Sequence, residues 1–148
     1  DFLFVGATAR NDWSSTLPAD SWSYFYPSVN MGFIFTNAFD LESNILSFGK
    51  VRASYAIVGG DASPYSLSNV YLSSSSAFDG ITQYYYTRTL ANANLLPERK
   101  YSWEVGTNLK FFNNRLGIDA TYYNSKTKDQ IMAIQVPTSS GFGHQWIN

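Results

Sequence analysis

The sequence contains no cysteine and a single histidine, His144. Without Cys there is neither a disulfide framework nor a thiolate metal site, and a lone His argues against zinc. We therefore expect no metal and no cofactor, and we expect His144 to be a solvent-facing loop residue. Charged residues are few, at 14%, and the formal net charge is −1, so binding to nucleic acid is not predicted either.

Long hydrophobic runs are also missing. No apolar run approaches the ~18 residues of a membrane-spanning helix, and the best helix-period segment, Ala38–Ile45, spans only a turn or two. Aromatic residues are instead abundant, with 11 Tyr, 11 Phe and 4 Trp in 148 residues. Many aromatics, few charges and no long apolar run indicate an all-β chain. It starts at Asp1 without Met and stops at Asn148 with its pattern unbroken, so we expect a piece of a longer polypeptide.

Alternation of apolar and polar residues with a period of two dominates the chain. Successive side chains of a strand point to opposite faces, so this alternation predicts strands with one apolar and one polar face. In the second such segment every residue of one parity is apolar: Phe25, Pro27, Val29, Met31, Phe33 and Phe35. The predicted strands are Phe2–Asp12, Tyr24–Thr36, Lys50–Val58, Tyr101–Phe112, Arg115–Asn124 and a weaker sixth, Gln130–Val136.

The connections between these strands alternate between short and long. Asn113-Asn114 predicts a tight two-residue turn, because Asn tolerates the positive φ that such turns need. Gly59–Arg99, which includes the serine run Ser73–Ser76, predicts a long loop. If the Asn turn is periplasmic, then Gly59–Arg99 and Ser14–Ser23 are extracellular and Thr36–Ser47 is periplasmic. Short periplasmic turns and long extracellular loops are typical of outer-membrane β-barrels.

Two architectures fit this periodicity, a soluble β-sandwich and a membrane barrel wall. The apolar faces of Phe25–Phe35 and Tyr101–Phe111 are long enough for a lipid-facing band of about 25 Å, and aromatic residues stand at their ends. Five such strands with unpaired edges would also aggregate unless further strands closed the sheet. These features favour the membrane wall. The alternative, a soluble or surface-attached β-sandwich that binds glycans, stays open, as does a passive porin.

Several blocks of residues resemble the barrel of TonB-dependent outer-membrane receptors, most of all the SusC/RagA type. They occur in the same order as in that family and cover nearly the whole chain. The blocks are Arg10-Asn11-Asp12-Trp13-Ser14-Ser15, Tyr24-Phe25-Tyr26-Pro27-Ser28-Val29, Lys50-Val51-Arg52-Ala53-Ser54-Tyr55-Ala56, Leu96-Pro97-Glu98, Ser102-Trp103-Glu104-Val105-Gly106, Phe111-Phe112-Asn113-Asn114-Arg115-Leu116, Tyr122-Tyr123 and Thr127-Lys128-Asp129-Gln130-Ile131.

The resemblance implies a transmembrane barrel of 22 antiparallel strands around an N-terminal plug, of which residues 1–148 supply five or six strands. It also implies an outer-membrane location, a SusD-like surface lipoprotein over the extracellular mouth, and energy delivered by TonB through the plug. The implied function is import of oligosaccharides or peptides. This chain contains neither the plug nor a TonB-contacting segment, so it cannot transport alone.

Candidate ligand contacts follow from sugar chemistry, since aromatic faces pack on sugar rings beside polar groups that bond hydroxyls. The strand pattern places a second set of charged residues on the polar face, the lumen side of a barrel, and the resemblance implies that they can contact the plug. The predicted ligand contacts are Tyr84, Tyr85, Tyr86, Trp13, Trp22, Arg10 and Asp12. The predicted lumen-facing or plug-facing residues are Arg52, Glu104, Lys110 and Asp119.

No catalytic constellation is predicted. Glu104 and Asp119 lie on strands that are adjacent across the Asn turn, and both face the lumen. They can be paired on paper as acid and base, as can Asp12 and Glu98, but a hydrated wall of mixed charge is the better interpretation. The serine run Ser73–Ser76 has no nucleophile-elbow context and is predicted to be loop. We expect a protein that is not an enzyme.

Overall fold

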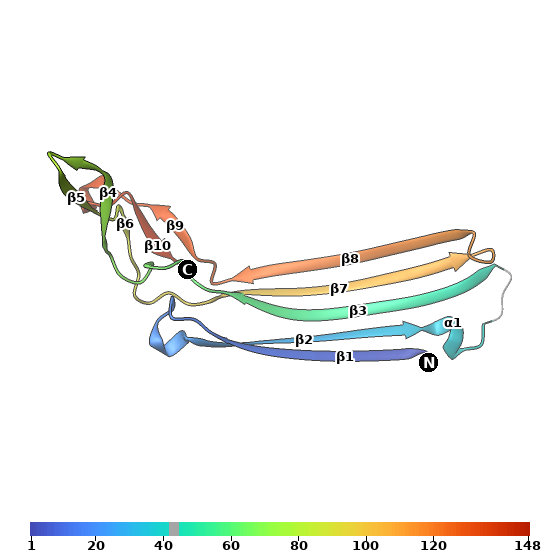
Figure 1. Cartoon of the computed structure of the whole chain (residues 1–148). Helices are drawn as coiled ribbons and strands as arrows, with labels where there is room; N and C mark the ends of the chain where they lie inside the picture. Colours follow the sequence, from blue (N-terminus) through green and yellow to red (C-terminus); the bar gives the residue numbers. More distant parts are fainter. Residues whose placement is uncertain (42–44) are drawn as a thin grey trace. The chain divides into compact units, whose positions relative to one another are not determined.

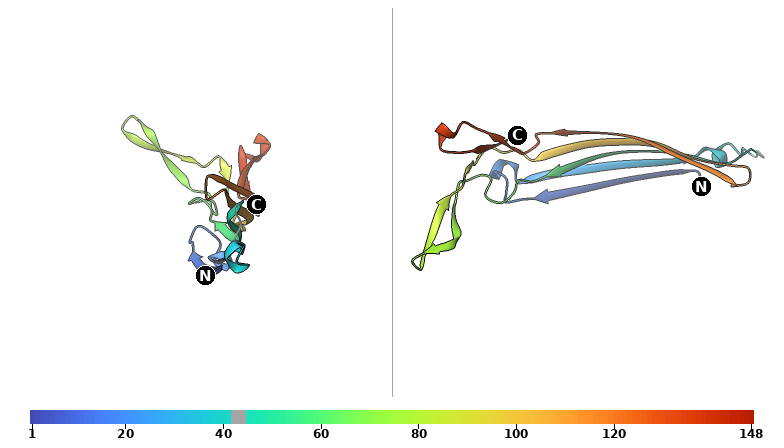
Figure 2. Two further views of the ribbon diagram at one scale, coloured as in Figure 1. Left: turned by 90° about the vertical axis from the view of Figure 1, so that its right-hand side faces the viewer. Right: turned by 90° about the horizontal axis from the view of Figure 1, so that it is seen from above.

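The computed structural model describes residues 1–41 and 45–148, and most of its regular structure is strand (Figure 1). Five long strands form one sheet in the order β1-β2-β3-β7-β8. Neighbouring strands run in opposite directions, and the view from above in Figure 2 shows them side by side. The predicted antiparallel all-β arrangement is confirmed. The strands are β1 Leu3–Trp13, β2 Ser23–Ile34, β3 Leu46–Gly60, β7 Glu98–Phe111 and β8 Leu116–Lys128.

These strands coincide with the five strongest alternating segments of the sequence. Three of them are longer than predicted: β3 begins at Leu46 instead of Lys50, β7 begins at Glu98 instead of Tyr101, and β8 continues to Lys128 instead of ending at Asn124. A strand continues wherever a neighbouring strand offers hydrogen-bond partners, even after the alternation has faded. Strand ends are therefore decided by pairing more than by local pattern.

The connection after β2 contains one turn of helix, α1 Phe35–Ala38. The predicted helix Ala38–Ile45 was placed too late, and its residues 42–44 lie outside the described residues. The helix begins early because Thr36 is buried against β3, where its Oγ1 accepts a hydrogen bond from the Gly49 amide at 3.1 Å. β2 consequently stops at Ile34, short of its predicted end. Within the described part of the chain, no helix has the length and apolarity to cross a membrane.

The turn between β7 and β8 has the predicted positive φ at both Asn residues, but the connection is longer than two residues, because it runs from Phe112, whose φ is 52°, to Arg115. Asn113 and Asn114 have φ of 55° and 66°, and the Arg115 amide donates to the Phe112 carbonyl at 3.2 Å. Two central residues with positive φ and an i to i+3 hydrogen bond are the marks of the mirror-image turns that fit the twist of antiparallel strands.

The prediction that Gly59–Arg99 is all loop was wrong. This segment contains β4 Tyr71–Phe78 and β5 Ile81–Tyr86, which pair as an antiparallel hairpin, and the short β6 Thr89–Leu90. The serines of Ser73–Ser76 therefore lie in a strand. The missed signal was Asp79-Gly80, a favoured hairpin dipeptide, whose φ values are 48° and 76°. Pairing with β5 holds both ends of this strand despite serine's weak strand preference, and the register shifts between Ser73 and Ala77.

The weak sixth strand, predicted as Gln130–Val136, exists only as β9 Met132–Gln135 and does not join the long sheet. It pairs antiparallel with β10 His144–Ile147, and β10 pairs in parallel with β6. His144 is exposed as expected, but it lies in this strand and not in a loop. Two single 3-10 turns, η1 Ala19–Ser21 and η2 Thr138–Ser140, complete the elements.

The chain divides into two compact units. The first comprises Asp1–Asn11, Phe25–Val58 and Lys100–Thr127, most of the long sheet. The second comprises Asp12–Tyr24, Gly59–Arg99 and Lys128–Asn148, which contain the connection between β1 and β2, the connection between β3 and β7, and all of the short strands. The most buried side chains among the described residues, Leu17 and Leu95, belong to the second unit, at 1% and 0% exposure. The long sheet exposes both of its faces.

Candidate functional site

The register between β2 and β3 separates the two faces of the long sheet. Met31 pairs with Ala53 and Val29 with Tyr55 on the apolar face, while Gly32 pairs with Arg52 and Asn30 with Ser54 on the polar face. On the apolar face the rings of Trp103 and Tyr122 lie 5.4 Å apart, and both are well exposed. The sheet therefore presents a mostly apolar surface on one side and a polar wall on the other.

A hydrogen-bonded network crosses the polar wall from β3 to β8. Nη2 of Arg52 lies 3.0 Å from Oδ1 of Asp119 and donates to Oγ1 of Thr121 at 2.5 Å. Nδ2 of Asn108 donates to the other Asp119 oxygen at 2.9 Å. Because β7 lies between β3 and β8, the arginine side chain passes over Gly106. A methyl group at Gly106 would stand 2.7 Å from Nε of Arg52.

The other predicted wall residues are separate from this network. Lys110 places Nζ 5.5 Å from the ring centroid of Phe48, a cation–π distance. Glu104 is exposed and borders a shallow hollow of the wall with Ser54, Ser102 and Tyr123. Asp119 bonds Arg52 and Asn108, so the structure does not make Glu104 and Asp119 an acid–base pair.

Glu98 has a structural role that the sequence did not reveal. Its Oε1 accepts a hydrogen bond from the Ile131 amide at 2.7 Å, which ties the start of β7 to the segment after β8. Pro97 stands just before the strand, where a missing N–H does not interrupt the ladder. In the described part of the chain no group of three His, Asp or Glu side chains is placed to hold a metal ion.

Two of the predicted ligand contacts, Trp13 and Trp22, stand at the two ends of the connection between β1 and β2. Trp13 is 74% exposed at the end of β1. The indole Nε1 of Trp22 donates to the Leu17 carbonyl at 2.5 Å, and the Ser14 amide donates to the Trp22 carbonyl at 2.9 Å, so Trp22 closes this loop. Arg10 is exposed and Asp12 is half-buried, both on β1.

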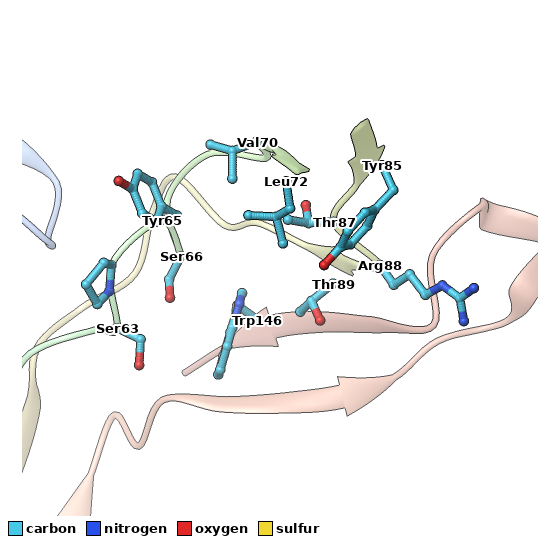
Figure 3. A pocket seen from close by; sticks show the side chains of 11 residues that line it. Ser63, Tyr65, Ser66, Val70, Leu72, Tyr85, Thr87, Arg88, Thr89 and Trp146 are labelled. Carbon is cyan, nitrogen blue, oxygen red and sulfur yellow. The ribbon is translucent and has the colours of Figure 1, made fainter. Parts of the chain in front are cut away.

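A pocket of about 410 Å³ lies in the second unit, and Figure 3 shows its lining. The hairpin register places Tyr85 opposite Leu72, and both side chains line the pocket. Tyr84 and Tyr86 have the other parity and point to the opposite face of β5, where the ring of Tyr86 lies 5.1 Å from that of Tyr71. Only Tyr85 among the predicted ligand contacts lines this pocket.

Sequence reasoning missed the partners of Tyr85. Trp146 comes from β10, Tyr65 from the segment before β4, and Arg88 from the segment between β5 and β6 (Figure 3). Asn69 braces this region: its Nδ2 donates to Oγ1 of Thr87 at 2.8 Å and to the Thr89 carbonyl at 2.9 Å, and its Oδ1 accepts from the Ala91 amide at 3.0 Å. No local pattern joins segments so far apart in the sequence.

Comparison with known proteins identifies the family. Residues 3–148 match the family described as TonB dependent receptor-like, beta-barrel. The chain belongs to this family. A TonB-dependent receptor of Formosa agariphila is 30% identical over 152 residues, covering all of this chain and 15% of the relative. The TonB-dependent receptor SusC of Bacteroides thetaiotaomicron is 31% identical over 153 residues, covering 97% of this chain and 15% of the relative.

Solved receptor structures carry the same fold. The RagAB peptide importer in its closed-closed state matches 99% of this chain with a TM-score of 0.83 and 27% identity, and its open-open state matches with a TM-score of 0.77. This chain spans 16% of the RagAB chain that it matches and about 15% of the curated receptors. The long sheet therefore corresponds to one sector of a TonB-dependent receptor barrel.

Proposed function

We propose that this chain forms part of the wall of a closed outer-membrane barrel, and that the complete receptor imports oligosaccharides or peptides. The single observation that carries the proposal is the two-faced sheet. One face is mostly apolar, and the other holds Arg52, Asp119 and other polar groups. In the proposed barrel the apolar face meets lipid and the polar face lines the lumen, which membership of the receptor family supports.

The open edges of the sheet support closure by further strands. β1 and β8 each have a neighbour on one side only, and they are 11 and 13 residues long. Unpaired strands of this length would template aggregation. Pairing with additional receptor strands would satisfy their backbone groups, which a membrane demands.

The import hypothesis brings partners with it. In the proposed mechanism, TonB pulls on a plug that fills the barrel, and a SusD-like surface lipoprotein closes over the extracellular mouth. The lumen-facing charges Arg52, Lys110, Glu104 and Asp119 would contact the plug or the water around it. The proposed mechanism contains no covalent step, so the receptor is not expected to be an enzyme.

Paired cysteines on β2 test which face meets lipid. Asn30→Cys is expected to react with a small charged thiol reagent in intact membranes, because its side chain lies on the polar face beside Gly6. Met31→Cys is expected to resist that reagent and to react with a lipid-soluble maleimide, because it lies on the apolar face beside Ala53. Each variant is the other's control, since the two sites are adjacent.

Equal labelling of both sites by the charged reagent would contradict the membrane wall and would favour the soluble β-sandwich instead.

Import itself is tested by uptake of labelled saccharides and peptides in cells with and without the receptor. Uptake is expected to stop when TonB is deleted, and uptake that continues would indicate a passive porin.

A further inference from the structure

We propose that the pocket lined by Tyr65, Tyr85 and Trp146 binds one unit of a saccharide. This proposal rests on the import function proposed above and narrows its substrate class. The volume of about 410 Å³ lies within the usual range for small-ligand sites, roughly 300–1,000 Å³. That space is large enough for a hexose, whereas a folded partner would need a wider surface.

Aromatic rings form the walls of the pocket. Tyr65 is 73% and Tyr85 51% exposed, so both side chains are accessible from solvent, and Trp146 completes the lining from β10 (Figure 3). Aromatic faces pack against the C–H faces of sugar rings, while the Tyr and Trp polar atoms remain available for hydroxyls. Aromatic residues from three separate segments thus belong to the lining of one pocket.

The polar groups of the pocket are better suited to bind the hydroxyl groups of a sugar than the positively charged groups of a peptide. Ser63, Ser66, Thr87 and Thr89 contribute hydroxyl groups, each able to donate and to accept a hydrogen bond. Among the described residues, Arg88 is the one charged member of the lining, and no Asp or Glu belongs to it. The lining therefore offers no carboxylate to a cationic ligand and suits a neutral or acidic sugar better.

The backbone around the pocket is held in place before any ligand arrives. Three hydrogen bonds of the Asn69 side chain connect the segment before β4 to the segment after β5. The Asn92 amide donates to the Ser66 carbonyl at 3.0 Å, and Ser66 itself is 2% exposed. Tyr65 is kept at a φ of 64°, a conformation that bulky residues avoid unless their surroundings impose it. Preorganisation of this kind lowers the ordering cost of binding.

The test uses the complete receptor, purified in detergent and applied to an array of plant, algal and animal glycans and to a peptide array. Wild type is expected to retain glycans, and the best glycan is then titrated by fluorescence. Tyr85→Ala and Trp146→Ala are each expected to weaken binding about tenfold or more, from the loss of one stacked ring. Tyr85→Phe is expected to retain most of the wild-type affinity, because it keeps the aromatic ring.

Tyr84→Ala is the matched control. It removes the same side chain from the same strand, but on the face away from the pocket, and is expected to leave affinity within about twofold. Equal losses for Tyr84→Ala and Tyr85→Ala, retention of peptides only, or no retained glycan would each overturn the proposal. A receptor that passes the β2 cysteine test and still retains no glycan would refute the pocket and leave the import proposal standing.

Discussion

At the scale of single residues, Gly106 leaves the space that the Arg52 side chain occupies on the polar wall. Its lack of a side chain lets Arg52 cross β7 and reach both Asp119 and Thr121. A methyl group there would also stand 3.0 Å from Oγ1 of Thr121. The sequence pattern explained this glycine only as a small residue of the polar parity, whereas the contact over it depends on the neighbouring strands.

We expect Gly106→Ala to displace the Arg52 side chain and to destabilise the receptor by about 1 kcal/mol. Gly117→Ala is the control, because a Cβ at Gly117 has no atom within 4 Å, and its effect is expected to stay within about 0.5 kcal/mol. Thermal unfolding of both variants in detergent measures the difference. Equal stabilities would mean that the arginine network contributes nothing to the fold.

At the scale of elements, the alternation of β7 carries the membrane interpretation. Glu104 and Val105 are neighbours near the middle of its 14 residues, and they point to opposite faces. Their local sequence environment is nearly the same. A charge placed at the two positions therefore compares the two faces directly.

Val105→Arg is expected to destabilise the inserted barrel by about 2–4 kcal/mol, the cost of arginine on a lipid face near the bilayer midplane. Glu104→Arg is expected to fold normally, since this position borders a polar hollow of the wall. Urea unfolding in lipid vesicles measures both free energies. If the Glu104 variant proved the less stable of the two, the assignment of faces would be reversed.

At the scale of the whole molecule, β1 and β8 must find partners for their open edges. We expect the complete receptor to have a mass on the order of 100 kDa, because this 16.6-kDa chain spans about 15% of its relatives, and to run as a compact species that slows after boiling. A gel of unheated and boiled samples, probed with an antibody to Gly59–Arg99, checks both points. A water-soluble 16.6-kDa band without a shift would contradict the barrel.

The amino-acid sequence by itself determined the five long strands, their two faces and the Asn113-Asn114 turn. Alternation with period two and the tolerance of Asn for positive φ are local properties, and residues within a few positions of each other express them. The resemblance to TonB-dependent receptors extended this local pattern to the family, which the comparisons confirm.

Tertiary structure alone decided what the connections do. Three features depend on pairing between segments that are not adjacent in the sequence. They are the strands inside Gly59–Arg99, the place of Tyr85 in the pocket lining, and the presence of both Tyr65 and Trp146 in that lining. The same holds for Arg52 and Asp119, which are 67 residues apart and lie on strands separated by β7. Period and propensity describe one strand at a time, whereas these contacts arise from the register between strands, which no local pattern encodes.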